Sequence, residues 1–151
     1  MAVLVSPFEL PPGRLLALDL GQARHGVAVC DETGTLATPL TVLRRHETRA
    51  ADFAEVQALV TRERVMGVLV GLPVQGQGQA SKQQRWVLRY AKRLAGALSV
   101  PVAFWDETLS SQDAAALVRH RRRQPLDAAA AALVLQDFLE ARQFQPRLGD
   151  K

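Results

Sequence analysis

Three acidic side chains of this chain stand at rigid positions. Asp19 ends the apolar run at 15–18, Glu107 follows the apolar run at 102–105, and Asp127 opens a long helix rich in alanine and leucine. A carboxylate at such a position is costly to desolvate unless a cation, a hydrogen-bond network or a proton compensates it. If folding brings the three together, their oxygen atoms favour Mg²⁺ or Mn²⁺ as the compensating cation.

Such a cluster could hydrolyse a phosphodiester. Two or three carboxylates can hold divalent ions about 3.5–4 Å apart, so that one ion activates a water and the other stabilises the leaving oxygen. No side-chain nucleophile is then required. The three histidines, His25, His46 and His120, have no metal-ligand spacing, and none pairs with a serine or with Cys30. We interpret them as surface or structural residues.

Each carboxylate also has a structural interpretation. Asp19 could accept hydrogen bonds from the turn amides at Gly21 and beyond, and Asp127 could complement the dipole of its helix. Asp106 precedes Glu107, and neighbouring side chains of a strand point to opposite faces, so both can join one site only if the chain bends. The residues alone do not choose between Asp106 and Glu107.

Basic residues are concentrated in the second half of the chain. The net charge is +4, yet residues 1–80 hold seven Lys and Arg against eight Asp and Glu, whereas residues 81–151 hold twelve against seven. This asymmetry favours a polyanionic ligand such as nucleic acid. The candidate contacts are a helical stripe of Lys82, Arg85, Arg89 and Arg93, and a cluster ahead of Asp127 made of Arg119, Arg121, Arg122 and Arg123. The alternative for the stripe is an ordinary solvated helix face.

The apolar periodicity and the turn residues predict the elements that must position these side chains. We expect a three-stranded antiparallel meander at 14–20, 25–30 and 35–43, with Pro39 placing the third strand towards an edge. There follow a helix at 48–64, a buried strand at 65–72, a helix at 81–98 that opens with a Ser81 and Gln84 capping box, a strand at 100–105, a short helix from 110 or 111 to about 120, and a helix from 125 to about 143. This order predicts an α/β fold with a five-stranded mixed sheet and about four helices.

The length of 151 residues fits one domain. We divide the chain into an N-terminal extension at 1–13, a nuclease domain at 14–143 and a flexible tail at 144–151. The single cysteine, Cys30, favours a reducing compartment and a place in the core. The apolar start is short and carries Glu9, so it fits neither a signal peptide nor a membrane span. We expect a cytoplasmic protein with no membrane partner.

Four sequence blocks, in order, resemble the YqgF/RuvX family. They are LDLGQARHGVAV at 18–29, VGLP at 70–73, DETLSS at 106–111 and LDAAAA at 126–131. Proteins of this family are similar to Holliday junction resolvases, belong to the RNase H superfamily and are implicated in maturing the 5′ end of bacterial pre-16S ribosomal RNA. Each block alone is weakly specific, because Asp-x-Gly also opens sugar kinases and actin-like ATPases. Those enzymes need two such domains, and this chain holds one.

The resemblance implies an RNase H-like fold with strand order 3-2-1-4-5. It also implies that Asp19, Glu107 and Asp127 match the family's acidic site, which selects Glu107 over Asp106. Arg24 matches a basic position of the family at which it would meet a phosphate.

The alternative for Arg24 is a salt bridge to Asp31 or Glu32. The chain departs from the family pattern at Thr108, where arginine is common, at His25, where an aliphatic residue is common, and in the Gln-Gly loop, which is usually more acidic.

We therefore expect a hydrolase, a nuclease that depends on Mg²⁺ or Mn²⁺ and acts on structured nucleic acid. The substrate could be structured RNA such as pre-rRNA, or branched DNA, and the protein could be a monomer or a homodimer. Two other functions stay open. One is a noncatalytic nucleic-acid-binding module on the same fold. The other is a dinucleotide-binding enzyme, in which Gly76 and Gly78 would approach a pyrophosphate and Asp106 a ribose.

Overall fold

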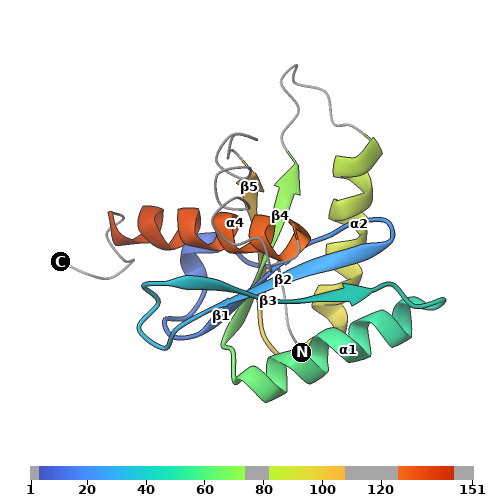
Figure 1. The fold of residues 1–151 in the computed structure, drawn as a ribbon, viewed down its shortest axis with the longest axis horizontal. Helices are drawn as coiled ribbons and strands as arrows, with labels where there is room; N and C mark the ends of the chain where they lie inside the picture. The colour runs from blue at the N-terminus through green and yellow to red at the C-terminus, as the bar shows by residue number, and fades with distance from the viewer. Residues whose placement is uncertain (1–3, 74–81, 108–125, 145–151) are drawn as a thin grey trace.

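The computed structural model describes residues 4–73, 82–107 and 126–144, and they form one sheet covered by helices on both faces (Figure 1). The strands are β1 (Leu15–Asp19), β2 (Arg24–Cys30), β3 (Ala37–Arg44), β4 (Gly67–Pro73) and β5 (Val102–Glu107). The helices are α1 (Arg49–Glu63), α2 (Lys82–Ala97), α4 (Leu126–Gln143) and the short 3₁₀ helix η1 (Pro7–Glu9).

The sheet has the strand order β3-β2-β1-β4-β5. β1 and β2 are antiparallel, as are β2 and β3, whereas β1, β4 and β5 run parallel. The predicted mixed sheet, its meander and its strand order are confirmed. The meander is antiparallel because its connections are short, while each parallel pair is joined through a helix that returns the chain to the same end of the sheet.

The third strand begins two residues later than expected. The amides of Thr35 and Leu36 donate hydrogen bonds to the Asp31 carboxylate, at 2.8 and 2.9 Å, so these residues close a turn and do not extend the strand. Pro39 pairs with Ala28 next to a shift in the register of β2 and β3. Proline donates no ladder hydrogen bond, and β3 does lie at the edge of the sheet, as predicted.

Side chains of the central strands alternate between two apolar layers. On one face Leu16, Leu18, Val68 and Val70 pack with the buried residues of α1 and α2. On the other face Leu15, Ala17 and Leu69 pack against the alanines, Leu135 and Phe138 of α4. In Figure 1 α4 lies across one face of the sheet and α1 and α2 lie on the other. This alternation tells which side any residue at a strand end will face.

Local signals explain where α1 begins and ends. Thr48 caps α1 by accepting a hydrogen bond from the Ala51 amide at 3.2 Å, and the helix ends at Arg64, which adopts a left-handed conformation with φ of 56°.

The start of α2 is tied to the end of β4. The Gln84 side chain donates to the Pro73 carbonyl at 2.8 Å. Ser81, the other half of the predicted capping box, lies outside the described residues.

The N-terminal residues pack against the far edge of the sheet. Leu4 forms a parallel bridge with Val102, and the Val5 amide donates to the Val102 carbonyl at 2.9 Å. Phe8 lies edge-on to Trp105, with ring centroids 5.7 Å apart. The extension therefore covers the open edge of β5. The predicted short helix at 110–120 and the tail from 145 lie outside the described residues.

Candidate metal and nucleic-acid site

Asp19 is the last residue of β1. Its side chain shares the parity of Leu15 and Ala17, so it points to the face of the sheet that α4 covers. The ladder between β1 and β4 ends at the pair of Leu18 and Val70, which places Asp19 level with Gly71. The carboxylate thus stands at the carboxyl end of a central strand, where open α/β sheets commonly bind ligands.

Glu107 lies on the same face of the sheet, on β5, which β4 separates from β1. β5 extends to Glu107, two residues beyond the predicted end, because Asp106 and Glu107 continue the ladder opposite Leu72 and Pro73. Glu107 shares the parity of Trp105, which packs against the α4 layer. Asp106 shares the parity of Phe104, which packs against the opposite layer, and its side chain is exposed. The straight strand therefore separates the two neighbouring carboxylates.

Gly71 leaves space for Glu107 between β1 and β5. A Cβ at Gly71 would lie 2.7 Å from Oε1 and 3.1 Å from Cγ of Glu107, so the glutamate side chain folds over this glycine. β1 and β5 are separated by one strand, which puts their backbones roughly 10 Å apart. The bare backbone at Gly71 lets a long side chain from β5 lean towards β1 across that gap. This role of Gly71 was not predicted from the sequence.

The Glu107 carboxylate is incompletely satisfied. Its Oε1 atom is buried and has no hydrogen-bond partner among the described residues. A buried carboxylate oxygen without a hydrogen-bond donor lowers the stability of the fold, on the order of several kcal/mol, unless a cation or a proton compensates it. This atom, on the same face as Asp19, is the one direct sign in the described residues that the strand ends accommodate a positively charged group.

Asp127 is the second residue of α4, and its side chain lies outside the described residues. In the part of the chain that the structure describes, no group of three or more His, Cys, Asp or Glu side chains could hold a metal ion. The structure thus brings Asp19 and Glu107 to one face and one end of the sheet. The third member of the predicted acidic site stays a prediction.

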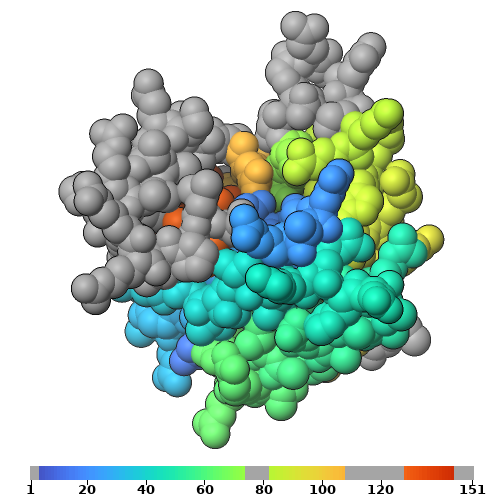
Figure 2. All heavy atoms as spheres, turned by 45° about the vertical axis from the view of Figure 1, so that its right-hand side comes forward, coloured from blue at the N-terminus to red at the C-terminus, as the bar shows by residue number. Residues whose placement is uncertain are grey.

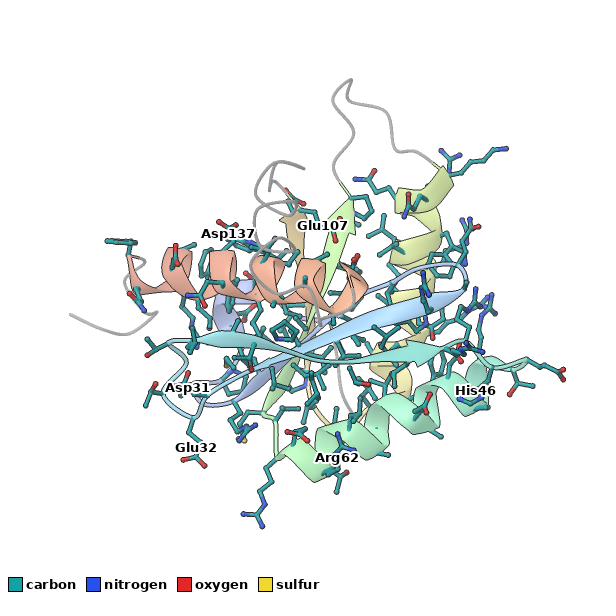
Figure 3. The ribbon with its side chains drawn as sticks, in the orientation of Figure 1. Asp31, Glu32, His46, Arg62, Glu107 and Asp137 are labelled. Carbon is teal, nitrogen blue, oxygen red and sulfur yellow. The ribbon has the colours of Figure 1, made fainter. Side chains whose placement is uncertain are left out.

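A second carboxylate near β5 is already paired. Trp105 donates from its indole nitrogen to Oδ2 of Asp137 on α4, at 2.8 Å. Figure 3 shows Glu107 at the end of β5 and Asp137 on α4, in separate places. The Asp137 pair fastens α4 to β5, the strand that carries Glu107, and so helps to fix the position of the site.

The predicted basic stripe lies on the outer surface of α2. Lys82, Arg85, Arg89 and Arg93 are all exposed, while Val87, Tyr90 and Leu94 of the same helix are buried. Arg24 is exposed at the first position of β2. The cluster of Arg119, Arg121, Arg122 and Arg123 lies outside the described residues, as does the glycine loop at 76–81 on which a dinucleotide site would depend.

Figure 2 shows how these parts share one face of the molecule. The turn between β1 and β2, drawn in blue, lies between the end of β5, drawn in orange, and α2, drawn in yellow-green. The acidic strand ends and the basic helix are therefore neighbours on that surface. A separate surface cavity of about 650 Å³, lined by Arg14 and Met66 among others, lies where β1 and β4 begin and is at the other end of the strands.

His25 is a buried polar residue whose partners the sequence did not reveal. Its side chain is 1% exposed, and its Nε2 atom lies 3.2 Å from the Tyr90 hydroxyl, which donates to Asp52 at 3.1 Å. Burial lowers the pKa of His25 to about 4, against the opposing charge of Asp52, so the ring is neutral at pH 7. The structural interpretation of His25 fits this arrangement, but its partners come from strands and helices far apart in sequence.

The remaining candidates for nucleophilic chemistry are structural. Cys30 is buried, accepts the Leu15 amide at 3.2 Å, and has its pKa raised by burial, so its thiolate is disfavoured. His46 pairs through Nε2 with Glu55 at 2.9 Å on the surface. Neither residue has the neighbours that an activated nucleophile needs.

Comparison with known sequences decides the family. The sequence model of the RuvX family, described as a Holliday junction resolvase, matches residues 13–141. The chain belongs to the RuvX family. The match includes all four blocks on which the resemblance was based, so that interpretation of the sequence is confirmed.

Two relatives of this chain are 38–40% identical to it over most of their length. A protein of Thermosynechococcus vestitus named "Putative pre-16S rRNA nuclease" is 40% identical over 134 residues, which cover 85% of this chain and 88% of the relative. A protein of the same name from Chloroflexus aurantiacus is 38% identical over 138 residues, covering 87% and 90%. The relatives thus match this RuvX-family chain over nearly their full length.

Solved structures confirm the RNase H-like fold. Thermus thermophilus RuvC superposes with a TM-score of 0.57 at 19% identity, covering 86% of this chain and 96% of RuvC. The same protein in complex with a Holliday junction substrate gives a TM-score of 0.59, covering 87% and 96%. At this identity the likeness establishes the architecture of the sheet and helices, and the chemistry must be argued from the chain's own residues.

None of the helices in the described part of the chain has the length and apolar composition needed to cross a bilayer.

Proposed function

We propose that this RuvX-family chain is a nuclease that hydrolyses phosphodiester bonds of structured nucleic acid with Mg²⁺ or Mn²⁺ held by Asp19, Glu107 and Asp127. The observation that carries the proposal is the buried Oε1 of Glu107, which has no hydrogen-bond partner in the described residues and lies over Gly71 on the face that Asp19 shares. A carboxylate so placed needs a cation or a proton to compensate it.

The donor set fits a hard divalent cation. Carboxylate oxygens are the ligands that Mg²⁺ and Mn²⁺ favour, and Asp19 and Glu107 provide them from two rigid strand ends. A bound cation would supply a more acidic water as nucleophile and would offset negative charge on the leaving oxygen. The chain's own contribution is to fix the carboxylates and to bind the substrate backbone.

Substrate binding is assigned to basic residues around the acidic strand ends. Lys82, Arg85 and Arg89 would contact phosphates along α2, and Arg24 would contact one beside the turn that follows Asp19. We assign the cluster of Arg119, Arg121, Arg122 and Arg123 to the same task. Contacts of this kind give affinity that falls steeply with salt and little preference among bases.

The names of the relatives and the RuvC complex suggest the substrate class. The relatives are named for pre-16S rRNA and the RuvC structure contains a Holliday junction, and both are structured nucleic acids. We propose that this chain cuts structured RNA such as an rRNA precursor, or branched DNA, in the cytoplasm, leaving 5′-phosphate and 3′-hydroxyl ends. It would do so as a monomer or a homodimer.

The test uses purified protein, end-labelled four-way junction DNA and a labelled 16S rRNA precursor, with and without Mn²⁺. We expect metal-dependent cleavage that is lost in Asp19→Asn, Glu107→Gln and Asp127→Asn. Asp106→Asn is the matched control, because its exposed side chain points to the opposite face of β5. Binding without cleavage in the wild type would indicate a noncatalytic module, and full activity in the three variants would place the chemistry elsewhere.

A further inference from the structure

The turn that follows Asp19 is held by side chains from outside it. Residues 20–23 connect Asp19, at the end of β1, with Arg24, at the start of β2. The proposed metal ligand and the proposed phosphate contact therefore flank this turn. A Cβ at Gly21 would collide with the backbone carbonyl of Arg24, which shows how tightly the turn closes. The conformation of these four residues therefore sets how the backbone leaves Asp19 and enters Arg24.

Two residues fix the polar backbone groups of this turn. The Gly21 amide donates to Nδ1 of His25 at 3.2 Å. Arg45 donates from its guanidinium to the Gln22 carbonyl at 3.1 Å and from its own amide to the Ala23 carbonyl at 3.0 Å. His25 and Arg45 therefore hold three successive residues of the turn by hydrogen bonds, and we call these two residues the clamp.

The histidine arm of this clamp has a defined proton arrangement. Because the Gly21 amide is a donor, Nδ1 of His25 must accept, and the ring proton must be on Nε2. Nε2 lies 3.2 Å from the Tyr90 hydroxyl, which in turn donates to Oδ2 of Asp52 at 3.1 Å. Nε2 of His25 then donates to the Tyr90 hydroxyl, and that hydroxyl donates to Asp52. A doubly protonated ring could not accept from Gly21.

The arginine arm is anchored on the same carboxylate. Nε of Arg45 is 3.5 Å from Oδ2 of Asp52. The Arg45 guanidinium also lies over the rings of Trp86 and Tyr90, at 5.2 and 5.7 Å from their centroids. Asp52 further accepts the His46 amide at 2.6 Å. Both arms of the clamp therefore end at one buried carboxylate of α1, and both touch α2.

We propose that His25 and Arg45, anchored on Asp52, are positioning residues that hold the turn after Asp19 and so aim the Asp19 carboxylate at the metal. This inference rests on the proposed role of Asp19 as a metal ligand. The clamp contacts the backbone of the turn and not the reacting atoms, so its effect is on the geometry of Asp19. Outer contacts that orient a metal ligand typically change metal affinity or activity by about 10- to 100-fold.

The experiment compares His25→Leu, which loses both hydrogen bonds of the ring, with His46→Leu, the matched control on the surface. The first readout, on metal-free protein, is amide hydrogen exchange at Gly21 and a long-range ¹⁵N spectrum of the His25 ring. The wild type should show a protected Gly21 amide and a ring protonated on Nε2 alone. In His25→Leu the Gly21 amide should exchange faster, and in His46→Leu it should not change.

The second readout is the Mn²⁺ dissociation constant by calorimetry, with junction cleavage as a function of Mn²⁺. We expect His25→Leu to weaken Mn²⁺ binding about tenfold and His46→Leu to leave it unchanged. Tyr90→Phe keeps the ring and removes only the hydroxyl, so it should fold. It should weaken Mn²⁺ binding by a smaller factor than His25→Leu does. Excess Mn²⁺ should rescue part of the cleavage lost in His25→Leu, because its carboxylates are all present.

Two failures are distinguishable. If the wild type binds no Mn²⁺, the proposed function is refuted, and the clamp then positions no metal ligand. If the wild type binds Mn²⁺ and His25→Leu binds it equally well while its Gly21 amide exchanges faster, the positioning role alone is refuted. A ring protonated on Nδ1 would also overturn it, because that tautomer cannot accept from Gly21.

Discussion

Two carboxylates on opposite faces of the sheet, each with a buried oxygen, differ in their hydrogen-bond partners. Asp52, 3% exposed, accepts the Tyr90 hydroxyl and the His46 amide and lies beside the Arg45 guanidinium. Glu107 has a buried oxygen with no hydrogen-bond partner among the described residues. Both groups are unfavourable to desolvate, and among the described residues only Asp52 has partners that compensate it.

The difference separates a structural role from a functional one. A carboxylate with internal partners is bound to them and stabilises the fold as long as all members of the network are present. A carboxylate with an unmet oxygen lowers stability and persists only if the fold gains something from it, such as a bound cation. Removing Asp52 should therefore damage the fold, and neutralising Glu107 should damage the chemistry.

The largest expected effect is on cleavage by Glu107→Gln. We expect a loss of about a thousandfold or more, or about 4 kcal/mol in the barrier, because the variant removes a charged ligand from the site. The free energy of unfolding without metal should stay equal or rise, since the amide is less costly to bury than the carboxylate. Single-turnover cleavage and urea unfolding measure the two. A destabilised variant with intact cleavage would reverse the comparison.

The complementary change is Asp52→Ala. It leaves Tyr90, Arg45 and the His46 amide without their shared acceptor, and we expect a loss of about 3–4 kcal/mol in the free energy of unfolding. Glu55→Ala is the control, because Glu55 forms an exposed pair with His46 and its loss should change stability by about 0.5 kcal/mol or less. Equal losses of unfolding free energy in the two variants would show that the buried network of Asp52 stabilises the fold no more than the exposed pair of Glu55.

The network also predicts how stability depends on pH. The pKa of His25 is about 4 in the folded chain and about 6.5 when unfolded, so between these values the unfolded chain binds more protons. The free energy of unfolding should therefore rise with pH across this window and fall on acidification from pH 6.5 to 4. A shift of this size corresponds to about 3 kcal/mol.

The measurement compares the wild type with His25→Leu at pH 4 to 7. On acidification the free energy of unfolding should fall less in the variant than in the wild type, because the variant lacks the His25 ring. Parallel pH profiles of the two proteins would show that His25 is not held neutral by the fold.

The smallest expected effect is at Gly71. The added Cβ of Gly71→Ala would overlap Oε1 of Glu107, the far end of a flexible side chain, so the carboxylate should turn aside with little strain elsewhere. We expect Mn²⁺ binding weaker by about tenfold and stability changed by less than about 1 kcal/mol. Gly96→Ala on α2, where nothing lies within 4 Å, should leave Mn²⁺ binding unchanged. Calorimetry that shows no difference would mean that Glu107 does not lie over Gly71.

Most of the fold could be predicted from the sequence, because its signals are local. Apolar runs, the turn at Asp31 and the edge position of Pro39 correctly indicated five strands, and the structure has them within one to two residues at most ends. The late start of β3 has a local cause, the turn at Asp31, whereas a distant contact decides the end of β5. β5 continues to Glu107 because β4 is beside it to pair with, and no property of residues 106–107 themselves required that.

The site could be predicted only in part. Asp19 and Glu107 were named from their places after apolar runs, and the choice of Glu107 over Asp106 depended on a family resemblance until the alternation of side chains in β5 placed them on opposite faces. Gly71, Tyr90 and Asp52 were not predicted to support the site. Asp52 lies in the first turn of α1, where an acid often complements the helix dipole at the surface, and it is buried instead.

The sequence by itself determined the class of the protein, since residue order sets the strands, the helices, the family and the residue types available for chemistry. Only the tertiary structure decided which acid would be satisfied and which would be left with an unmet oxygen. The physical reason is that hydrogen-bond partners and burial are relations between segments, such as His25 with Tyr90 or Glu107 with Gly71. These pairs stand dozens of residues apart in the chain and become neighbours only when the sheet and its helices close around them.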